Sequence, residues 1–182
     1  MVVCVTNRKL CPGDFLKTVE KACARSDMLI LREKDLDPLA YTCLAEQVLP
    51  LCRKQGILFA VHSRIEAARE LPCDALHLSY PDFVHLATQE GLFCKTGVSI
   101  HSVEEGREAE RLGAHYLIAG HVYETASKLG KPPRGLSFIR SLTAAVKIPV
   151  YAIGGIHAGN GEAVLKAGAK GLCMMSQMMQ CV

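Results

Sequence analysis

Polar side chains lie at the ends of the short apolar runs of this sequence, and many of them are of types that bind anions or transfer protons. Histidine has a reference pKa of about 6.5 and exchanges protons near neutral pH, while arginine, lysine, hydroxyl groups and glycine amides bind phosphate and carboxylate groups. The residues at these ends are Thr6, Asn7, Arg32, Lys34, His62, His77, Ser79, Ser99, His101, His121, Gly154, Gly155 and Ser176. Gathered in one place, they would form a pocket for a small anionic molecule.

A glycine pair, Gly154 and Gly155, follows the apolar run at residues 150–153. Glycine leaves backbone amides open to a ligand, and Ser176 opens a short helix after the next apolar run. Two neighbouring loops of this kind suit a phosphate group. A Gly-Gly pair alone is equally consistent with a plain tight turn.

The longest irregular stretch is GHVYETASKLGKPPRG, at residues 120–135. Long loops in compact domains tend to be functional, and this composition is typical of a loop that closes over an anion. A solvated basic loop is the alternative. The polar residues of the stretch are His121, Glu124, Thr125, Ser127, Lys128, Lys131 and Arg134.

Eight apolar runs recur along the chain, and most are continuous rather than alternating. Continuous runs are typical of parallel strands that are covered on both faces. The runs lie at residues 2–6, 28–31, 58–61, 75–78, 96–100, 115–119, 150–153 and 171–175. Segments with helical spacing lie between them, at residues 15–24, 38–56, 102–113, 137–146 and 160–168.

Strands that alternate with helices predict βαβ units and a parallel sheet. We expect a compact single-domain (β/α)8 TIM barrel over residues 1–182, with a shortened last helix because only SQMMQCV follows the last run. The competing doubly wound sheet usually brings a G-x-G-x-x-G turn, which this sequence lacks. In a barrel, the residues at the strand ends converge on one mouth.

The composition argues against several classes of protein. The 21 basic and 18 acidic residues are mixed along the chain, so we expect no nucleic-acid partner. No stretch approaches the roughly 18 apolar residues of a membrane span, and the first residues lack a signal-peptide core, so we expect a cytoplasmic protein without a membrane partner. Nine cysteines without a C-x-x-C pair indicate free thiols rather than a zinc site or a disulfide framework.

Seven segments spread over nearly the whole chain resemble a known family. They read VTNRKLCPG, LILREKD, DALHLSYPD, TGVSIHSVEEG, GAHYLIAGHVYETASK, IPVYAIGGI and AGAKGLCMMS. On these segments the chain is similar to the thiamine phosphate synthase and TenI superfamily, small barrels of thiamin biosynthesis. The tautomerase branch resembles it most closely at GHVYET, where the synthase branch typically has G-P-x-x-x-T.

The chain departs from the synthase pattern at the residues that hold Mg2+. The resemblance implies one aspartate after strand three, where this chain has Val61-His62-Ser63, and a second after strand four, which Asp82 matches. The Gly-Gln pair before the second aspartate is replaced by Ser79-Tyr80, and the glutamine of a Q-L-R motif is replaced by Ile30. Loss of a carboxylate should weaken a Mg2+ site.

The resemblance also implies roles for individual residues. Arg32 and Lys34 would face substrate anions, and Gly154, Gly155 and Ser176 would hold a phosphate. Further substrate-binding positions, by the same resemblance, are His77, Ser99, Thr125, Ser127 and the pyrophosphate-facing Lys128.

On these grounds the sequence analysis favours a thiazole tautomerase, an isomerase that needs no metal or cofactor. It would aromatise a carboxylated dihydrothiazole phosphate by moving a proton from the ring to the exocyclic carbon, with His121 as both base and acid and Arg32 on the ring carboxylate. The alternative is thiamine phosphate synthase, which joins a thiazole phosphate to hydroxymethylpyrimidine pyrophosphate and would need Mg2+. A second alternative is a non-catalytic or regulatory barrel that binds thiazole phosphate. Each implies a phosphorylated thiazole as partner, and a homo-oligomer is compatible with all three.

Overall fold

The computed structural model of the protein describes residues 1–180, and within them eight parallel strands form a closed barrel in the order β1 to β8. The (β/α)8 prediction is therefore confirmed. The strands are β1 (Val2–Val5), β2 (Met28–Leu31), β3 (Leu58–His62), β4 (Ala75–Ser79), β5 (Thr96–Ile100), β6 (Tyr116–Gly120), β7 (Val150–Ile153) and β8 (Gly171–Met174). The helices are α1 (Phe15–Cys23), α2 (Pro38–Lys54), α3 (Ile65–Glu70), α4 (Tyr80–Gln89), α5 (Val103–Arg111), α6 (Gly135–Ala145), α7 (Gly161–Lys166) and α8 (Ser176–Gln180).

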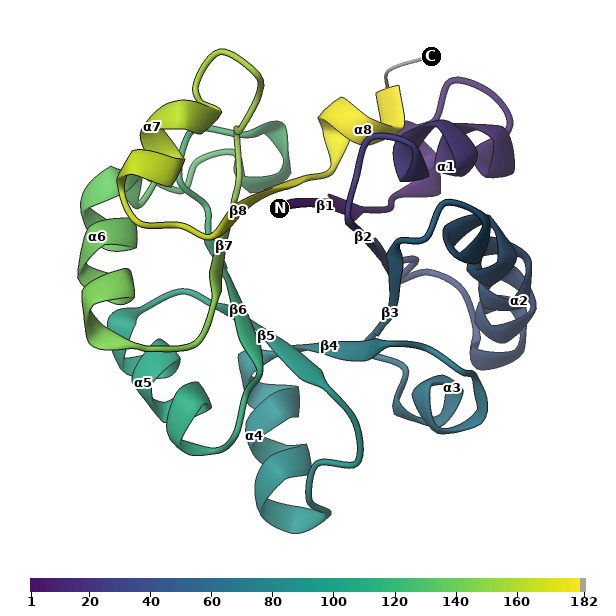
Figure 1. Cartoon of the computed structure of the whole chain (residues 1–182), viewed down its shortest axis with the longest axis horizontal. Helices are drawn as coiled ribbons and strands as arrows, with labels where there is room; N and C mark the ends of the chain where they lie inside the picture. Colours follow the sequence, from purple (N-terminus) through teal and green to yellow (C-terminus); the bar gives the residue numbers. More distant parts are fainter. Residues whose placement is uncertain (181–182) are drawn as a thin grey trace. The chain divides into compact units, whose positions relative to one another are not determined.

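The chain divides into two compact units. Unit 1 contains Met1–His77 and the C-terminal residues from Met174, and unit 2 contains Leu78–Cys173. In unit 1, helices α1 and α2 pack together beside strands β1 to β3, and in unit 2 helices α5 and α6 pack together beside strands β5 to β7 (Figure 1).

The central residues of the unit 1 strands are buried on both faces, as their continuous apolar runs predict. The β2 residues Met28–Leu31 are at most 2% exposed and pair in register with β1 and β3. Tyr41 joins helix α2 to the ends of strands β2 and β3. Its hydroxyl donates to the Leu31 carbonyl at 2.6 Å and accepts from the His62 amide at 3.1 Å.

A buried hydrogen-bond network joins the end of β1 to the segment after β2. The carboxylate of Glu33, which is 3% exposed, accepts the Thr6 hydroxyl at 2.7 Å and the Arg8 backbone amide at 3.1 Å. The Thr6 hydroxyl oxygen in turn accepts the Arg32 amide at 2.9 Å. Thr6 and Glu33 therefore fix the backbone at Arg32.

In unit 2, strands β5, β6 and β7 and residues 171–173 of β8 pair in sequence order. Gly97 of β5 lies against the ring of Tyr116 on β6, and a Cβ at this position would overlap that ring. The Tyr116 ring is 3% exposed and packs against Tyr151 with centroids 5.6 Å apart. Only glycine at position 97 leaves room for this pair.

The helix ends mostly agree with the sequence signals. Ser102 caps α5 and its hydroxyl accepts the Glu105 amide at 3.1 Å, as the capping-box signature predicts, but the Glu105 carboxylate accepts from His101 rather than from Ser102. The five-residue α8 confirms a shortened last helix within the described chain. Two helices that the sequence analysis did not locate, α3 and α4, complete the alternation.

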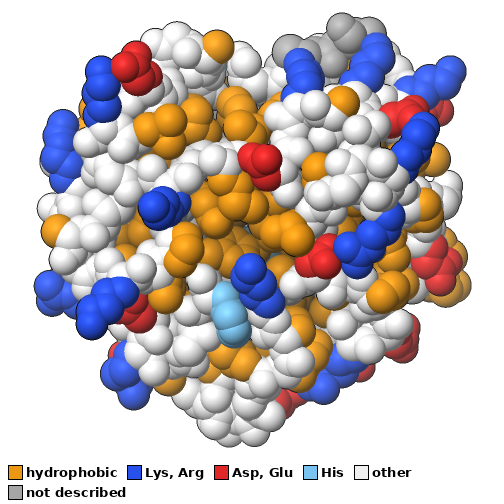
Figure 2. Space-filling model, viewed as in Figure 1, with side chains coloured by type: hydrophobic (Ala, Val, Ile, Leu, Met, Phe, Trp, Pro, Cys, Tyr) orange, Lys and Arg blue, Asp and Glu red, His pale blue; other side chains and the backbone are white. Residues whose placement is uncertain are grey.

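Eight cysteines lie in the described part of the chain, and all of them are free. Cys181 lies outside the described residues. No helix in residues 1–180 is long and apolar enough to cross a membrane. On the face shown in Figure 2, the described Lys and Arg side chains are dispersed among acidic, hydrophobic and uncharged ones and form no continuous stripe.

Candidate active site

The segment that follows β6 is tied to unit 2 at both of its ends. At its start, the amides of Val122 and Tyr123 donate to the carbonyls of Ile153 and Gly154 at 2.9 and 3.0 Å. At its end, the Arg134 amide donates to the His121 carbonyl at 2.9 Å. The intervening residues therefore form a closed loop whose base lies against the end of β7.

The glycine pair after β7 allows this close approach. Gly154 and Gly155 have φ angles of +104° and +64°, which side-chain-bearing residues rarely adopt. A Cβ on Gly154 would overlap His121, and a Cβ on Gly155 would overlap the Glu124 carbonyl. The pair is thus required by backbone packing, and its predicted phosphate role stays a prediction.

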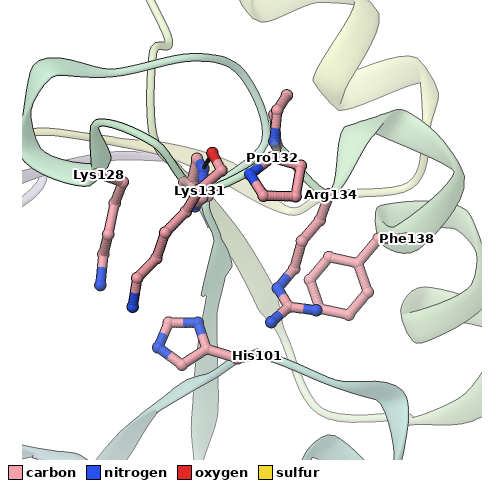
Figure 3. A pocket seen from close by; sticks show the side chains of 8 residues that line it. His101, Lys128, Lys131, Pro132, Arg134 and Phe138 are labelled. Carbon is pink, nitrogen blue, oxygen red and sulfur yellow. Dashed lines mark hydrogen bonds between the residues drawn. The ribbon is translucent and has the colours of Figure 1, made fainter.

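A cavity of about 480 Å³ lies under the loop. His101 enters it from the end of β5, His121 from the start of the loop, and Phe138 from α6. Figure 3 shows the side chains of Lys131 and Arg134 running from the loop toward the His101 ring, with Lys128 beside Lys131. The lining residues are His101, His121, Lys128, Lys131, Pro132, Pro133, Arg134 and Phe138. The cavity is therefore rich in positive charge and contains no carboxylate among these residues.

The two histidines of the cavity are oriented by backbone carbonyls. His101 Nδ1 lies 2.9 Å from the Gly120 carbonyl oxygen, and His121 Nε2 lies 3.2 Å from that of Lys131. Because a carbonyl oxygen only accepts, each of these ring nitrogens donates, which leaves the second nitrogen of each ring for another partner. His121 is 8% exposed, and its ring closes one wall of the cavity.

The other predicted residues of unit 2 lie on the same loop or on β5. Thr125 and Ser127 flank the start of a one-turn 3-10 helix (Ala126–Lys128), with their hydroxyl oxygens 3.2 Å apart. Lys128 ends that turn and lines the cavity, whereas Ser99 lies on β5 and is not among the lining residues.

Four predicted residues belong to unit 1. Arg32 is half-buried, and burial lowers its pKa although the neighbouring Glu33 acts in the opposite direction. Lys34 is exposed after β2, and Ser176 is exposed at the start of α8. The phosphate site predicted for Gly154, Gly155 and Ser176 combines residues of both units and stays a prediction.

His77 of β4 is the most deeply buried of the predicted residues, at 2% exposure. Burial lowers its pKa well below the ordinary value, and His62, whose ring centroid lies 5.7 Å away, lowers it further. His77 therefore stays neutral in the folded protein while the unfolded chain takes up a proton near pH 6.5.

This difference predicts a loss of stability in mild acid. Below about pH 6.5 the unfolded state binds one more proton than the native state, so the free energy of unfolding should fall by about 1.4 kcal/mol per pH unit from this group. Urea unfolding at pH 7.0 and pH 5.5 measures the slope. His77→Gln should flatten it, and equal slopes for both proteins would refute the assignment.

Sequence analysis placed His101 in the group of polar residues at the ends of the apolar runs but gave it no individual role. Lys131 and Arg134 were placed on the loop without individual roles. These three residues line one cavity. The sequence does not show this, because the walls of the cavity come from separate elements of the fold.

Comparison with known proteins places the chain in a family. Residues 2–178 match the family model described as "Thiamine monophosphate synthase". The chain belongs to the thiamine monophosphate synthase family. It is 35% identical over 181 residues to the thiamine-phosphate synthase of Syntrophomonas wolfei, covering 96% of this chain and 86% of that protein. The thiamine-phosphate synthase of Clostridium acetobutylicum is 33% identical, with 96% and 85% covered.

A solved structure agrees with this membership. The thiamine phosphate pyrophosphorylase of Pyrococcus furiosus superposes on this member of the thiamine monophosphate synthase family with a TM-score of 0.86 and 30% identity. The superposition covers 99% of this chain and 87% of that one. The resemblance inferred from the sequence segments is therefore confirmed at the level of the family.

The tautomerase prediction is wrong. It rested on the GHVYET segment and on the missing aspartate, whereas relatives about one-third identical over nearly the whole chain are thiamine-phosphate synthases. A handful of altered residues carries less weight than similarity along the whole barrel. The isomerase assignment, and the role of His121 as the acid and base of that reaction, are withdrawn with it.

Proposed function

We propose that this protein is a thiamine-phosphate synthase, which joins a thiazole phosphate to hydroxymethylpyrimidine pyrophosphate and releases pyrophosphate. The observation that carries the proposal is the 35% identity to a synthase across 96% of the chain. The cavity of unit 2 supports it, because three cationic side chains converge where an anionic substrate would bind.

The cationic cavity suits the chemistry of this transfer. When the pyrimidine carbon bonds to the thiazole, its bond to the pyrophosphate oxygen breaks, and negative charge builds on the departing group. Fixed cations aimed at such charge stabilise the transition state more than the ground state. Lys128, at the end of the 3-10 turn, is the residue for which the family resemblance also implies contact with the pyrophosphate.

The thiazole phosphate would be bound by the glycine pair after β7. Gly154 and Gly155 have no Cβ, and the side where one would lie is filled by the loop at His121 and Glu124. Their carbonyls are already used, since that of Gly154 accepts the Tyr123 amide and that of Gly155 accepts the Asn160 side chain at 2.9 Å. A carbonyl oxygen only accepts hydrogen bonds, so the backbone amides, which donate, would make the phosphate contacts.

Mg2+, which the family resemblance implies for a synthase, does not fit the residues present. His62 and Ser63 stand where one carboxylate is expected. The other, Asp82, lies in the first turn of α4 and accepts the Ser79 hydroxyl at 2.6 Å. Within residues 1–180, no three His, Cys, Asp or Glu side chains are grouped to hold a metal ion. We therefore assign no step to a metal.

The proposal is tested by incubating the purified protein with both substrates and measuring thiamine phosphate and pyrophosphate. We expect both products in equal amounts. Lys128→Ala should lower kcat/KM about 100-fold, because loss of one preorganised charge at a developing anion typically costs that much. Lys166→Ala is the matched control, since Lys166 pairs with Glu162 on the exposed side of α7 and should leave kcat/KM unchanged.

Two outcomes would contradict the proposal. Absence of product with intact binding of thiazole phosphate would indicate a binding protein rather than an enzyme. Product formation that Lys128→Ala and Lys166→Ala lower equally would show that the cavity is not where the reaction occurs.

A further inference from the structure

Helices α1 and α2 of unit 1 meet at a pair of buried thiols. The Sγ atoms of Cys23, the last residue of α1, and Cys52, in the last turn of α2, lie 3.8 Å apart. Both side chains are at most 1% exposed, and both cysteines are free. A disulfide bond would bring the two sulfurs to about 2.05 Å, so each would move by about 1 Å.

The two helix ends that carry these thiols are held side by side. Nζ of Lys54 on α2 pairs with Oε1 of Glu20 on α1 at 2.8 Å, and each of these residues lies within one helical turn of one of the cysteines. The Cys52 carbonyl accepts the Ile57 amide at 3.1 Å, which fixes the chain where α2 ends. The sulfurs therefore stay in contact in the folded protein.

The two thiols, and a third one near them, differ in reactivity. The hydrogen bond that Cys23 accepts from Cys52 lowers the pKa of Cys23, and the same hydrogen bond, together with burial, raises the pKa of Cys52. Cys4 of β1 is fully buried, and burial together with the nearby Cys23 raises its pKa. Because the thiolate is the reactive form, Cys23 is the nucleophile of the group.

Both cysteines lie at the edge of the core, where a small reagent can reach them. Exposed residues follow them directly in the sequence, at 24–25 and at 53–56. Pro50 lies inside α2 and has no amide hydrogen to donate, so the helix lacks one of its regular hydrogen bonds close to Cys52. Local opening of one helical turn would admit a molecule as small as hydrogen peroxide.

We infer that Cys23 and Cys52 form a site of reversible oxidation, where hydrogen peroxide converts the two thiols into a disulfide bond between α1 and α2. The Cys23 thiolate attacks a peroxide oxygen, the O–O bond breaks, and a sulfenic acid forms on Cys23. The hydroxide released takes up the proton that Cys23 had lost. The Cys52 sulfur then attacks the Cys23 sulfur, the S–O bond breaks, and water leaves with the Cys52 proton. Two thiols thus lose two electrons and two protons, and one peroxide becomes two water molecules.

The position of the pair indicates what the disulfide does. Cys23 and Cys52 precede the starts of β2 and β3, whereas Arg32 and Lys34, which were predicted to face substrate, follow the end of β2. In TIM barrels, residues at the end where the strands begin contribute to stability rather than to catalysis. The bond would close a loop of about 30 residues and so remove conformational entropy from the unfolded chain. Oxidation therefore stabilises the fold.

Peroxide treatment of the reduced full chain tests the inference, with alkylation of the remaining thiols in denaturant and mass spectrometry of the peptides. We expect a cross-linked pair of peptides that contain Cys23 and Cys52, lighter by two hydrogen atoms than the two reduced peptides together. Dithiothreitol should remove the cross-link. The urea midpoint of the oxidised protein should lie about 1 M above that of the reduced protein.

Cys52→Ala and Cys43→Ala are matched variants, because each removes one cysteine from α2. Cys43 is exposed, so Cys43→Ala should keep both the cross-link and the shift of the midpoint, whereas Cys52→Ala should abolish both. Cys43→Ala also leaves Cys52 as the only thiol of the tryptic peptide at residues 35–53. Each variant is compared with itself before and after peroxide, so destabilisation by the substitution does not affect the result.

Three results would overturn the inference. The first is the absence of a bond between Cys23 and Cys52 after peroxide treatment, whether the thiols stay free or Cys23 is oxidised further. The second is a cross-link that joins a different pair, such as Cys4 with Cys23. The third is a bond between Cys23 and Cys52 that leaves the urea midpoint unchanged. None of these readouts uses the synthase reaction, so the inference and the proposed function stand or fail separately.

Discussion

Gly155→Ala is expected to destabilise the protein by about 2 to 5 kcal/mol and to lower kcat/KM about 100-fold. Alanine at a φ of +64° costs about 1 to 2 kcal/mol, and the overlap of its Cβ with the Glu124 carbonyl adds about 1 to 3 kcal/mol. The second overlap is with Tyr123 Cβ at 2.8 Å. Relief of both contacts shifts the start of the loop, and a displacement of about 1 Å at a reacting site costs about 100-fold.

Gly56→Ala separates the two contributions. Gly56 follows α2 with a φ of +66°, nearly that of Gly155, but a Cβ there would meet nothing within 4 Å. Only the backbone cost of about 1 to 2 kcal/mol should remain, with no change in kcat/KM. Urea unfolding and steady-state assays measure both quantities. Equal destabilisation by the two substitutions would show that the close approach of loop and glycine pair contributes nothing.

Glu33→Ala is expected to lower the free energy of unfolding by about 3 kcal/mol. The substitution leaves the Thr6 hydroxyl and the Arg8 amide without their acceptor in a site where Glu33 is 3% exposed. The substitution also removes the ion pair between Glu33 and Arg8. Because the Arg8 side chain is about one-third exposed, water solvates part of its charge once Glu33 is lost. The expected destabilisation therefore lies at the low end of the range for breaking a buried ion pair. Urea unfolding at pH 7 measures the effect.

Asp35→Ala provides the control for this prediction. Asp35 also pairs with Arg8, at 2.7 Å, but on the surface. Its loss should leave the urea midpoint almost unchanged, since exposed ion pairs contribute little. If both substitutions lower the midpoint equally, the stabilisation comes from the charge of Arg8 rather than from the buried hydrogen bonds of Glu33.

The strands could be predicted closely from the sequence, and two of the helices could not. Runs such as residues 28–31 and 150–153 match their strands because a strand covered on both faces must be apolar at every position. Helix α3 has six residues, too few for a period of 3.6 to stand out, and α4 begins directly after β4 without a connecting loop. Its cap, Ser79, is also the last residue of β4, as the sequence predicted, so no loop marks the start of the helix.

The site was predicted in part. Histidine, lysine and arginine near strand ends were recognised as ligands of an anion, and Lys128 lies in the cavity. His101 was set aside, since nothing in its neighbourhood along the chain shows that its Nδ1 donates to the Gly120 carbonyl and so orients the ring. The functional prediction failed for a related reason, because a local motif was weighed above similarity along the whole chain.

The sequence by itself determined the alternation of strands and helices, the short last helix and the family, because these depend on the order and periodicity of residues along the chain. Only the tertiary structure decided which cations face one another without an acidic partner. It also revealed that the glycine pair is needed for the approach of the loop after β6. Such features depend on distances between residues far apart in sequence, which the folded backbone alone sets.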